Sequence, residues 1–315
     1  RHGTAMCSLI VRGDLSNNEE AISTPLFVRP IMRPSADNSA FEFIHNDQLL
    51  IDTIHRAVRG FFEMDGDQPP IASSVKIINL SLGDPGRLFF HSMSPWARLL
   101  DWLSHKYSVL FIVSTGNHTN EFQLDISRRE FNNLDTLEKE KVILNSFIKN
   151  ARNHPLLSPS ESINSLSVGA VHADNSEIHP YDQRVNPYSA SLPATYTAIG
   201  SGYRRAIKPD LVYLGGRQMF DFDHSDATVL RPSRYKSQPG IKVAAPDSTL
   251  NKTIFEHGTS NATALVSRNA HFCHDVLKEL VQLNGIEIPN NTIAVIIKAM
   301  LVHGCSWDTL QGELE

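Results

Sequence analysis

The sequence is poor in cysteine, in long apolar runs and in net charge, and each shortage excludes a class of protein. Its 315 residues include only Cys7, Cys273 and Cys305, an odd number without the spacing of a disulfide framework or a structural zinc site. No run of about 18 apolar residues is present, so no membrane span is expected. The net charge of −5 gives no reason to expect nucleic acid or an anionic membrane as a partner.

Signals for a cellular compartment are also few. The first residues, Arg1–Thr4, do not resemble a signal peptide, and the odd number of cysteines favours a reducing compartment. Two sequons, at Asn117 and Asn261, lie in stretches that we expect to form the functional site, where a glycan would block access. We therefore expect a cytoplasmic protein.

The hydrophobic residues, 41% of the chain, are enough for a large core and are patterned as alternating strands and helices. Apolar runs predict core strands at 75–82, 109–113, 166–171 and 241–246, and a shorter strand at 26–31. Helical spacing predicts helices over 2–12, 48–62, 95–107, 260–282 and 293–303, with Asp47 and Ser94 as N-caps. Two segments, at about 120–160 and 215–238, interrupt this order and are expected to be insertions in one domain of residues 1–315.

One stretch combines a glycine turn with a hydroxyl at the start of a helix. In Gly258-Thr259-Ser260 the serine is expected at a helix N-terminus, where free N–H groups favour a developing anion. Such a serine suits an acyl-transfer nucleophile, although a plain N-cap is the commoner use of this pattern. Likewise Asn117, after a predicted strand, is either a turn residue or an oxyanion donor.

Four separated stretches together resemble one family. His2-Gly3-Thr4, Ile77–Gly83, Ser114–Asn117 and His257–Ser260 are similar, in this order, to the catalytic-histidine, cleft-strand, oxyanion-asparagine and nucleophile motifs of the subtilisin-like serine peptidases, the subtilases of family S8. This resemblance extends over nearly the whole chain. It implies an α/β fold of three layers, with a central, mostly parallel sheet flanked by helices, and hydrolysis of a polypeptide substrate without a cofactor. Members of the family often carry structural calcium, but no cluster of ligands in this sequence supports the prediction of a metal site.

The resemblance also implies roles for particular residues. His2 is expected to be the general base, Ser260 the nucleophile and Asn117 the oxyanion donor. The substrate-binding residues would be Ser81, Leu82, Gly83 and Gly116. The edge near Ser81 offers backbone groups to an extended peptide, and the two glycines leave room for a substrate side chain between two strand ends.

One departure from the family concerns the third catalytic residue. Subtilases have their catalytic aspartate on a strand before the histidine motif, whereas only Arg1 precedes His2 here. Asp14 and Asp65 lie after the histidine, outside any matching motif. We therefore expect a fragment that lacks its N-terminal strand or strands, with the aspartate upstream in a longer protein. Without this carboxylate, activity would fall by about 10⁴.

Two other functions remain open at this stage. A degenerate subtilase could bind peptides or a partner protein without cleaving them, because His2 has no orienting carboxylate in this sequence. A general α/β-hydrolase is disfavoured, because no G-x-S-x-G elbow surrounds Ser260.

Overall fold

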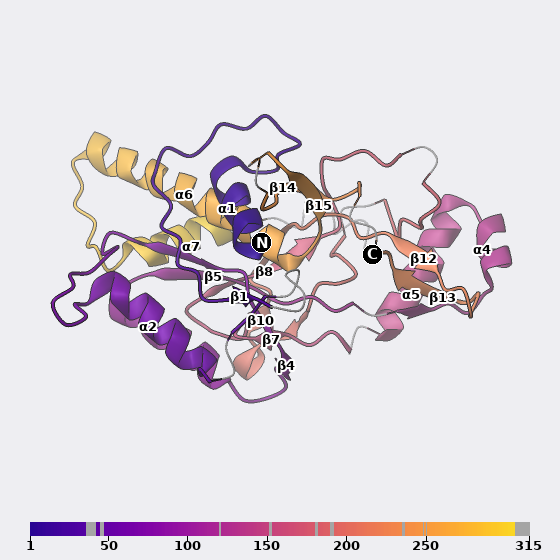
Figure 1. The fold of residues 1–315 in the computed structure, drawn as a ribbon, viewed down its shortest axis with the longest axis horizontal. Coiled ribbons are helices and arrows are strands. Elements are labelled where there is room, and N and C mark those ends of the chain that lie inside the picture. Colours follow the sequence, from indigo (N-terminus) through magenta and orange to yellow (C-terminus); the bar gives the residue numbers. More distant parts are fainter. Residues whose placement is uncertain are drawn as a thin grey trace.

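A four-stranded parallel sheet forms the centre of the protein in the computed structural model (Figure 1). The strands run side by side in the order β11-β8-β5-β3, and every neighbouring pair is parallel. Their bounds are β3 Ile77–Leu80, β5 Leu110–Ser114, β8 Leu166–Val171 and β11 Leu211–Leu214. The structure describes residues 1–35, 42–44, 47–119, 121–150, 153–179, 182–189, 192–234, 237–247, 249 and 251–305.

Helices cover both faces of this sheet, which makes a three-layer α/β fold and confirms the expected fold class (Figure 1). Successive residues of β5 point to opposite faces. Leu110 and Ile112 pack in one cluster with α6 and α7, whereas Phe111 and Val113 pack in another with α2 and α3. The helices are α1 His2–Arg12, α2 Leu50–Phe62, α3 Pro95–Tyr107, α4 Arg128–Asn133, α5 Thr136–Asn150, α6 Thr259–Asn284 and α7 Ile293–His303.

The remaining strands form small antiparallel sheets around the centre: β1 with β2, β4 with β7, β9 with β10, β14 with β15, and β12-β13-β6. They are β1 Arg33–Pro34, β2 Glu42–Phe43, β4 Asp84–Leu88, β6 Phe122–Gln123, β7 Leu157–Ser158, β9 Gly200–Ser201, β10 Ile207–Lys208, β12 Phe220–Phe222, β13 Val229–Pro232, β14 Ile241–Ala244 and β15 Thr253–Glu256. A short 3₁₀ turn, η2, lies at Tyr203–Arg205.

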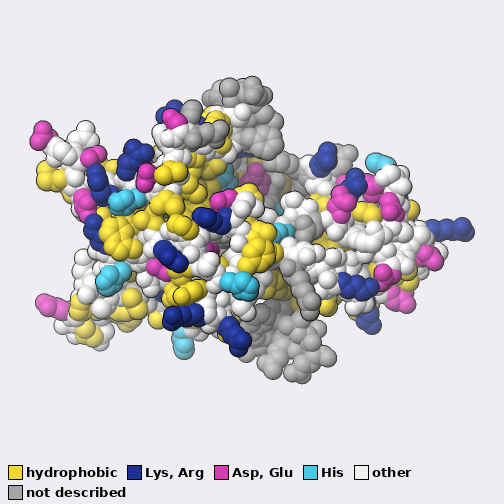
Figure 2. All heavy atoms as spheres, turned by 90° about the horizontal axis from the view of Figure 1, so that it is seen from below, with side chains coloured by type: hydrophobic (Ala, Val, Ile, Leu, Met, Phe, Trp, Pro, Cys, Tyr) yellow, Lys and Arg dark blue, Asp and Glu magenta, His cyan; other side chains and the backbone are white. Residues whose placement is uncertain are grey.

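Two segments far apart in the sequence come together in a separate lobe. Strand β6 pairs with β13, which pairs with β12, and α4 and α5 pack against them at the right of Figure 1. The lobe has its own apolar core of Phe122, Leu124, Phe131, Ile143, Phe220 and Leu230. Figure 2 shows charged side chains over the lobe end of this face, while hydrophobic ones gather nearer the central sheet.

Most of the predicted elements are present. Core strands are confirmed at β3, β5 and β8, and all five predicted helices form within a few residues of their expected bounds. Ser94 caps α3 by accepting the Ala97 N–H at 3.0 Å, as predicted. Within the described ranges, no helix is both long and apolar enough to cross a membrane.

Four predictions about elements were wrong or incomplete. Residues 26–31 form no strand, and they line a cavity opposite β3 instead of pairing with it. The run at 241–246 is not a core strand, because β14 pairs with β15 and with no other strand of the described residues, and it packs on α1. The fourth core strand is β11, in a segment that we expected to be mostly loop. Finally, α2 begins at Leu50 with Leu49 as its N-cap, so Asp47 does not cap it.

A buried histidine follows the core strand β8. The His172 ring is 2% exposed and lies edge-on to Tyr188, with ring centroids 4.7 Å apart. Its Nε2 lies 2.8 Å from Asn186 Oδ1, while its Nδ1 has no hydrogen-bond partner among the described residues. Burial lowers the pKa of His172 to about 4, because a charged ring in this position would lose its hydration.

We predict that the free energy of unfolding falls as the pH drops from about 7 towards 4, and that His172 carries part of this loss. The unfolded chain takes up the proton near the ordinary histidine pKa, whereas the native state does not until about pH 4. The His172 contribution at pH 5 is about 2 kcal/mol. Urea unfolding of His172→Gln at pH 7 and pH 5 should show a smaller pH dependence than the native sequence.

The matched control is His91→Gln, because His91 is exposed in the loop before α3. This variant should keep the native pH dependence. An unchanged pH dependence in His172→Gln would show that the histidine is not neutral in the folded state.

Candidate active site

Four elements meet where the parallel strands end. His2 is the first residue of α1, and Ser260 is the second residue of α6. Ser81 follows β3, and Asn117 lies just beyond β5. The carboxyl edge of a parallel sheet is where α/β folds place ligands, since the loops that follow the strands converge there.

The backbone carbonyl of Ser81 joins the predicted base and nucleophile. Its oxygen lies 3.0 Å from His2 Nε2 and accepts a hydrogen bond from Ser260 Oγ at 3.1 Å. The two side-chain atoms therefore lie within two hydrogen-bond lengths of each other. Because a carbonyl oxygen only accepts, His2 Nε2 carries a hydrogen in this arrangement.

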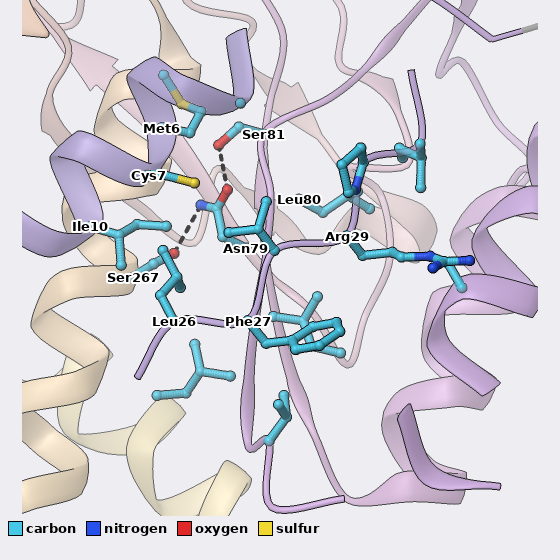
Figure 3. A pocket seen from close by; sticks show the side chains of 18 of the residues that line it. Met6, Cys7, Ile10, Leu26, Phe27, Arg29, Asn79, Leu80, Ser81 and Ser267 are labelled. Carbon is cyan, nitrogen blue, oxygen red and sulfur yellow. Dashed lines mark hydrogen bonds between the residues drawn. The ribbon is translucent and has the colours of Figure 1, made fainter. Parts of the chain in front are cut away.

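The Ser81 side chain connects α6 to the sheet. Its hydroxyl lies 3.0 Å from Asn79 Oδ1 and 3.2 Å from the Ser260 carbonyl oxygen. Asn79 Nδ2 in turn donates to Ser267 Oγ at 2.9 Å, so β3 and α6 are joined at two levels (Figure 3). We did not anticipate Asn79 and Ser267 from the sequence. The available signal was a single amide in the apolar run of β3.

Asn117 is fixed by its oxygen, which leaves its nitrogen available. Its Oδ1 accepts from the Thr259 backbone N–H at 2.8 Å and lies 3.0 Å from Thr259 Oγ1. Since a backbone N–H can only donate, the atom that it meets must be the amide oxygen. Asn117 Nδ2 has no hydrogen-bond partner among the described residues, and the Asn117 side chain is exposed. The arrangement keeps one N–H donor group free beside the start of α6.

Gly258 allows Asn117 to come this close. Its backbone has φ 156° and ψ 158°, a conformation used almost only by glycine. A Cβ at this position would lie 3.2 Å from Asn117 Nδ2. The start of α6 has no side-chain cap, so the Ser260 N–H, at the second helical position, has no acceptor within the helix.

The gap between Gly83 and Gly116 holds a side chain of the protein itself. A Cβ on Gly116 would lie 2.7 Å from the Leu157 Cβ, and one on Gly83 would lie 3.3 Å from the same atom. Leu157 is 5% exposed. The neighbouring Leu82 packs partly into the core cluster beneath β3 and contributes its backbone to this edge.

Among the described residues, no carboxylate hydrogen-bonds to the His2 ring. Glu42 Oε2 accepts from the His2 backbone N–H at 3.0 Å, which serves the start of α1 instead of the imidazole. Asp14, at the other end of α1, accepts from the Lys242 amide at 3.1 Å, and Asp65 pairs with an arginine of α2. Neither aspartate hydrogen-bonds to the His2 ring, in agreement with their lack of a matching motif.

A cavity of about 790 Å³ opens beside His2 (Figure 3). It lies between α1, α2, the edge strand β3 and residues 22–32. Met6, Ile10 and Leu26 are part of its apolar wall, and Asn79 and Ser81 form a polar stretch. The cavity runs along the side of β3 that has no neighbouring strand in the central sheet. No group of three or more His, Cys, Asp or Glu side chains within the described ranges could hold a metal ion.

The subtilase family model (Peptidase_S8) matches residues 1–303. The chain is a subtilase. The family comprises serine peptidases, in agreement with the meeting of histidine, serine and asparagine at the end of the sheet.

Individual proteins show more distant similarity to this subtilase. It is 31% identical over 150 residues to the uncharacterised protein y4bN of Sinorhizobium fredii. The aligned stretch covers 46% of this chain but only 32% of the relative. The prenylagaramide maturation protease PagA is similar over 92% of this chain and 69% of its own, with 17% identity and a TM-score of 0.43. The self-cleaved protease domain of PatA is similar over 77% of this chain and 55% of its own, with 16% identity and a TM-score of 0.37.

We predict that Gly258→Ala disrupts the site more than it destabilises the fold. The new Cβ would strain a glycine-only backbone, at a cost of about 1–3 kcal/mol, and would push the Asn117 amide aside. If Ser260 and Asn117 have the roles that the sequence predicts, the rate at which a fluorophosphonate labels Ser260 should fall by about 10², the effect of losing one oxyanion donor. Urea unfolding measures the first effect, and labelling kinetics measure the second.

Gly285→Ala is the matched control at the other end of α6. Gly285 has φ 60°, yet a Cβ there would meet nothing within 4 Å. It should cost about 1–2 kcal/mol of stability and leave labelling unchanged. Equal labelling rates in the two variants would contradict the role that we give to Gly258.

Proposed function

We propose that this subtilase is a serine endopeptidase in which Ser260 is the nucleophile and His2 the general base. The observation that carries the proposal is the shared hydrogen-bond acceptor, because Ser260 Oγ and His2 Nε2 both lie on the Ser81 carbonyl oxygen. A serine hydroxyl is a weak nucleophile on its own and needs a base within reach. Imidazole can take its proton and later return it to the leaving amine.

The first proton transfer requires a small change in the His2 ring. In the tautomer with hydrogen on Nδ1, Nε2 has a free lone pair and no longer binds the Ser81 oxygen. It can then accept the proton of Ser260 Oγ as this oxygen attacks the scissile carbonyl. The protonated ring next gives its proton to the leaving amine, and the acyl group remains on Ser260. Water releases it with the same base.

Asn117 and the start of α6 are proposed to stabilise the oxyanion of this reaction. Asn117 Nδ2 has no competing acceptor among the described residues, and the Ser260 N–H is free by its place in the helix. The dipole of α6 adds partial positive charge at the same point. The extended substrate is proposed to pair with the backbone at Ser81, Leu82 and Gly83, where β3 has ended.

The carboxylate that would orient His2 is proposed to lie in sequence before Arg1, in a longer protein. The cavity beside His2 supports this proposal, since it is bordered by the free side of β3 and by His2 itself. An extended segment in this cavity could pair with β3 and bring an aspartate to His2 Nδ1. We further propose that residues 1–315 belong to one peptidase domain, interrupted at about 120–160 and 215–238.

A second candidate function follows from the same gap. If no carboxylate reaches His2, the site would hold an extended peptide without cleaving it. The observation that favours this alternative is the absence, among the described residues, of any carboxylate on the imidazole. Reactivity of Ser260 separates the two functions, because a binding module has no activated nucleophile.

We predict that a fluorophosphonate labels Ser260 in the full-length protein and that His2 is required. The His2→Ala variant should react slower by about 10⁴ or more, since the serine loses its base. Ser260→Ala should not be labelled at all. Mass spectrometry of the labelled peptide measures site and extent.

The matched controls are the exposed His91→Ala and Ser73→Ala variants, which should react at the native rate. A folded full-length protein with unlabelled Ser260 would overturn the peptidase proposal and favour the binding function.

We predict that Asn117→Asp lowers kcat by about 10²–10³ with little change in KM, because it removes a donor that acts only in the transition state. The magnitude is that of the corresponding donor in subtilisin. The introduced carboxylate can still accept from the Thr259 N–H, so the local fold should survive. Asn117→Ala loses this acceptor as well and should cost about 1 kcal/mol more in stability. An Asn117→Asp variant with native kcat would exclude the donor role.

A further inference from the structure

We infer that Arg268 is a positioning residue for the reaction, because it fixes the helix of the predicted base against the helix of the predicted nucleophile. This inference rests on the proposed peptidase function. His2 opens α1, and Ser260 is the second residue of α6. The two helices lie side by side (Figure 1), and Leu9 of α1 and Leu265 of α6 share one apolar cluster.

The helices α1 and α6 run parallel and are joined at two levels. At their N-terminal ends, His2 and Ser260 meet on the Ser81 carbonyl oxygen. Val11 lies nine residues after His2, and Arg268 lies eight residues after Ser260. At 1.5 Å per residue these stretches are about 13.5 and 12 Å long, so Val11 and Arg268 reach the same level. The second junction therefore lies at the far end of α1 from the site.

Arg268 closes the C-terminal end of α1 through hydrogen bonds. Its Nη1 donates to the Val11 carbonyl at 2.7 Å and to the Ile10 carbonyl at 3.3 Å. Its Nη2 donates to the Glu20 carbonyl at 2.6 Å, and its Nε donates to Glu19 Oε2 at 3.2 Å. The last four carbonyls of a helix have no partner inside the helix. A side chain of α6 thus supplies donors to two of these four carbonyls of α1.

The contacts of Arg268 are buried. Arg268 is 5% exposed, and its guanidinium lies over the Phe272 ring at 4.9 Å. Gly13, the C-cap of α1, has φ 69°, and a Cβ at this position would overlap the Glu19 carboxylate. A larger residue at 13 would therefore displace Glu19 from Arg268.

The charge of Arg268 opposes a repulsion that the active site creates. The N-terminal ends of α1 and α6 both carry partial positive charge, and they lie together at the site. This arrangement suits an oxyanion, but it disfavours the packing of the two helices. A cation at the negative end of α1 offsets part of this cost. Arg268 is therefore placed where a positive charge helps to keep α1 against α6.

A role in positioning follows from what these contacts hold. Without the guanidinium, the Glu19 carboxylate and three carbonyls would lose a donor in a buried region, so the end of α1 would move to regain hydration. A shift of about 1 Å between reacting groups costs about 10² in rate. The backbone at Ser81, Leu82 and Gly83, where the substrate is proposed to bind, lies at the opposite end of α1. Loss of Arg268 should therefore lower kcat and affect KM little.

The test measures kcat and KM of the full-length protein and of its Arg268→Ala variant with a peptide p-nitroanilide. The variant should lose about 10² in kcat, with a nearly unchanged KM. Guanidinium chloride at millimolar concentration should restore much of the lost kcat, because the ion carries the charge and the donors of the missing group. Urea has a similar shape without the charge and should not restore it. A native kcat in the folded variant, or equal effects of guanidinium and urea, would overturn the inference.

Arg268→Lys is the second variant, and it keeps the charge if Arg268→Ala fails to fold. One ammonium group cannot reach the carbonyls of α1 and the acceptors at residues 19 and 20 as the guanidinium fork does. This variant should therefore also lose about 10-fold or more in kcat. A native kcat in Arg268→Lys would overturn the role of the fork.

Hydrogen exchange separates this inference from the peptidase function. In the Ser260→Ala background, Arg268→Ala should raise the exchange rates of the α1 amides by about 10-fold or more and leave those of α7 unchanged. Guanidinium should slow the α1 amides again. Unchanged exchange in α1 would overturn the inference, whether or not the native protein cleaves peptides. Failure of Ser260 labelling in the native protein, in contrast, would overturn only the peptidase function.

The matched control is Arg184→Ala. Arg184 is also a largely buried arginine, with 11% of its side chain exposed, and it contacts Asp182 and the Gln238 carbonyl. These partners belong to neither α1 nor α6, so the variant should keep the native kcat and show no response to guanidinium. If it lost kcat as Arg268→Ala does, the effect would come from general loosening of the protein, and Arg268 would not be a positioning residue.

Discussion

The predicted base and the predicted nucleophile are both positioned by Ser81, the residue that follows β3. Its carbonyl oxygen is the common acceptor of His2 Nε2 and Ser260 Oγ, and its hydroxyl lies within hydrogen-bond distance of Asn79 and of the Ser260 carbonyl. Three elements, α1, β3 and α6, are thereby held at fixed distances by a single residue of the sheet. Histidine and serine come within reach of each other even though no carboxylate holds the imidazole ring among the described residues.

The neighbouring strand supplies a second constraint of the same kind. Asn117, beyond the end of β5, uses its oxygen to hold the first amide of α6, so its nitrogen is left for other use. This position of the Asn117 side chain requires glycine at 258, because a Cβ there would lie 3.2 Å from the Asn117 amide nitrogen. Pre-oriented dipoles of this kind need no rearrangement when charge develops, which is why they can contribute more than equally strong bonds in water.

The sequence was most informative where helices cover both faces of an apolar run in the central sheet, as in β3, β5 and β8. The run around Val243 has the same apolar composition, so a core strand was expected there. It forms β14 instead, which lies outside the central sheet and packs on α1. Strand β11 is too short, and too close to Pro209 and Gly215, to stand out from its loop-rich surroundings. The order of the motifs predicted that His2, Asn117 and Ser260 belong to one site. Their roles stay predictions, as does the cytoplasmic location. No local pattern could place Leu157 between two glycines, because its neighbours in space are distant in the chain.

The lobe built on β6, β12 and β13 has a consequence for how the protein folds. Its core joins Phe122 to Leu230, and the chain between them contributes β8 and β11 to the central sheet. Residues so far apart meet only after a long loop has closed, at an entropic cost that no local contact offsets beforehand. Once β5, β8 and β11 are paired, the two segments emerge as neighbours and this cost has largely been met. We therefore expect the lobe to form late in folding, after the parallel sheet on which its assembly depends.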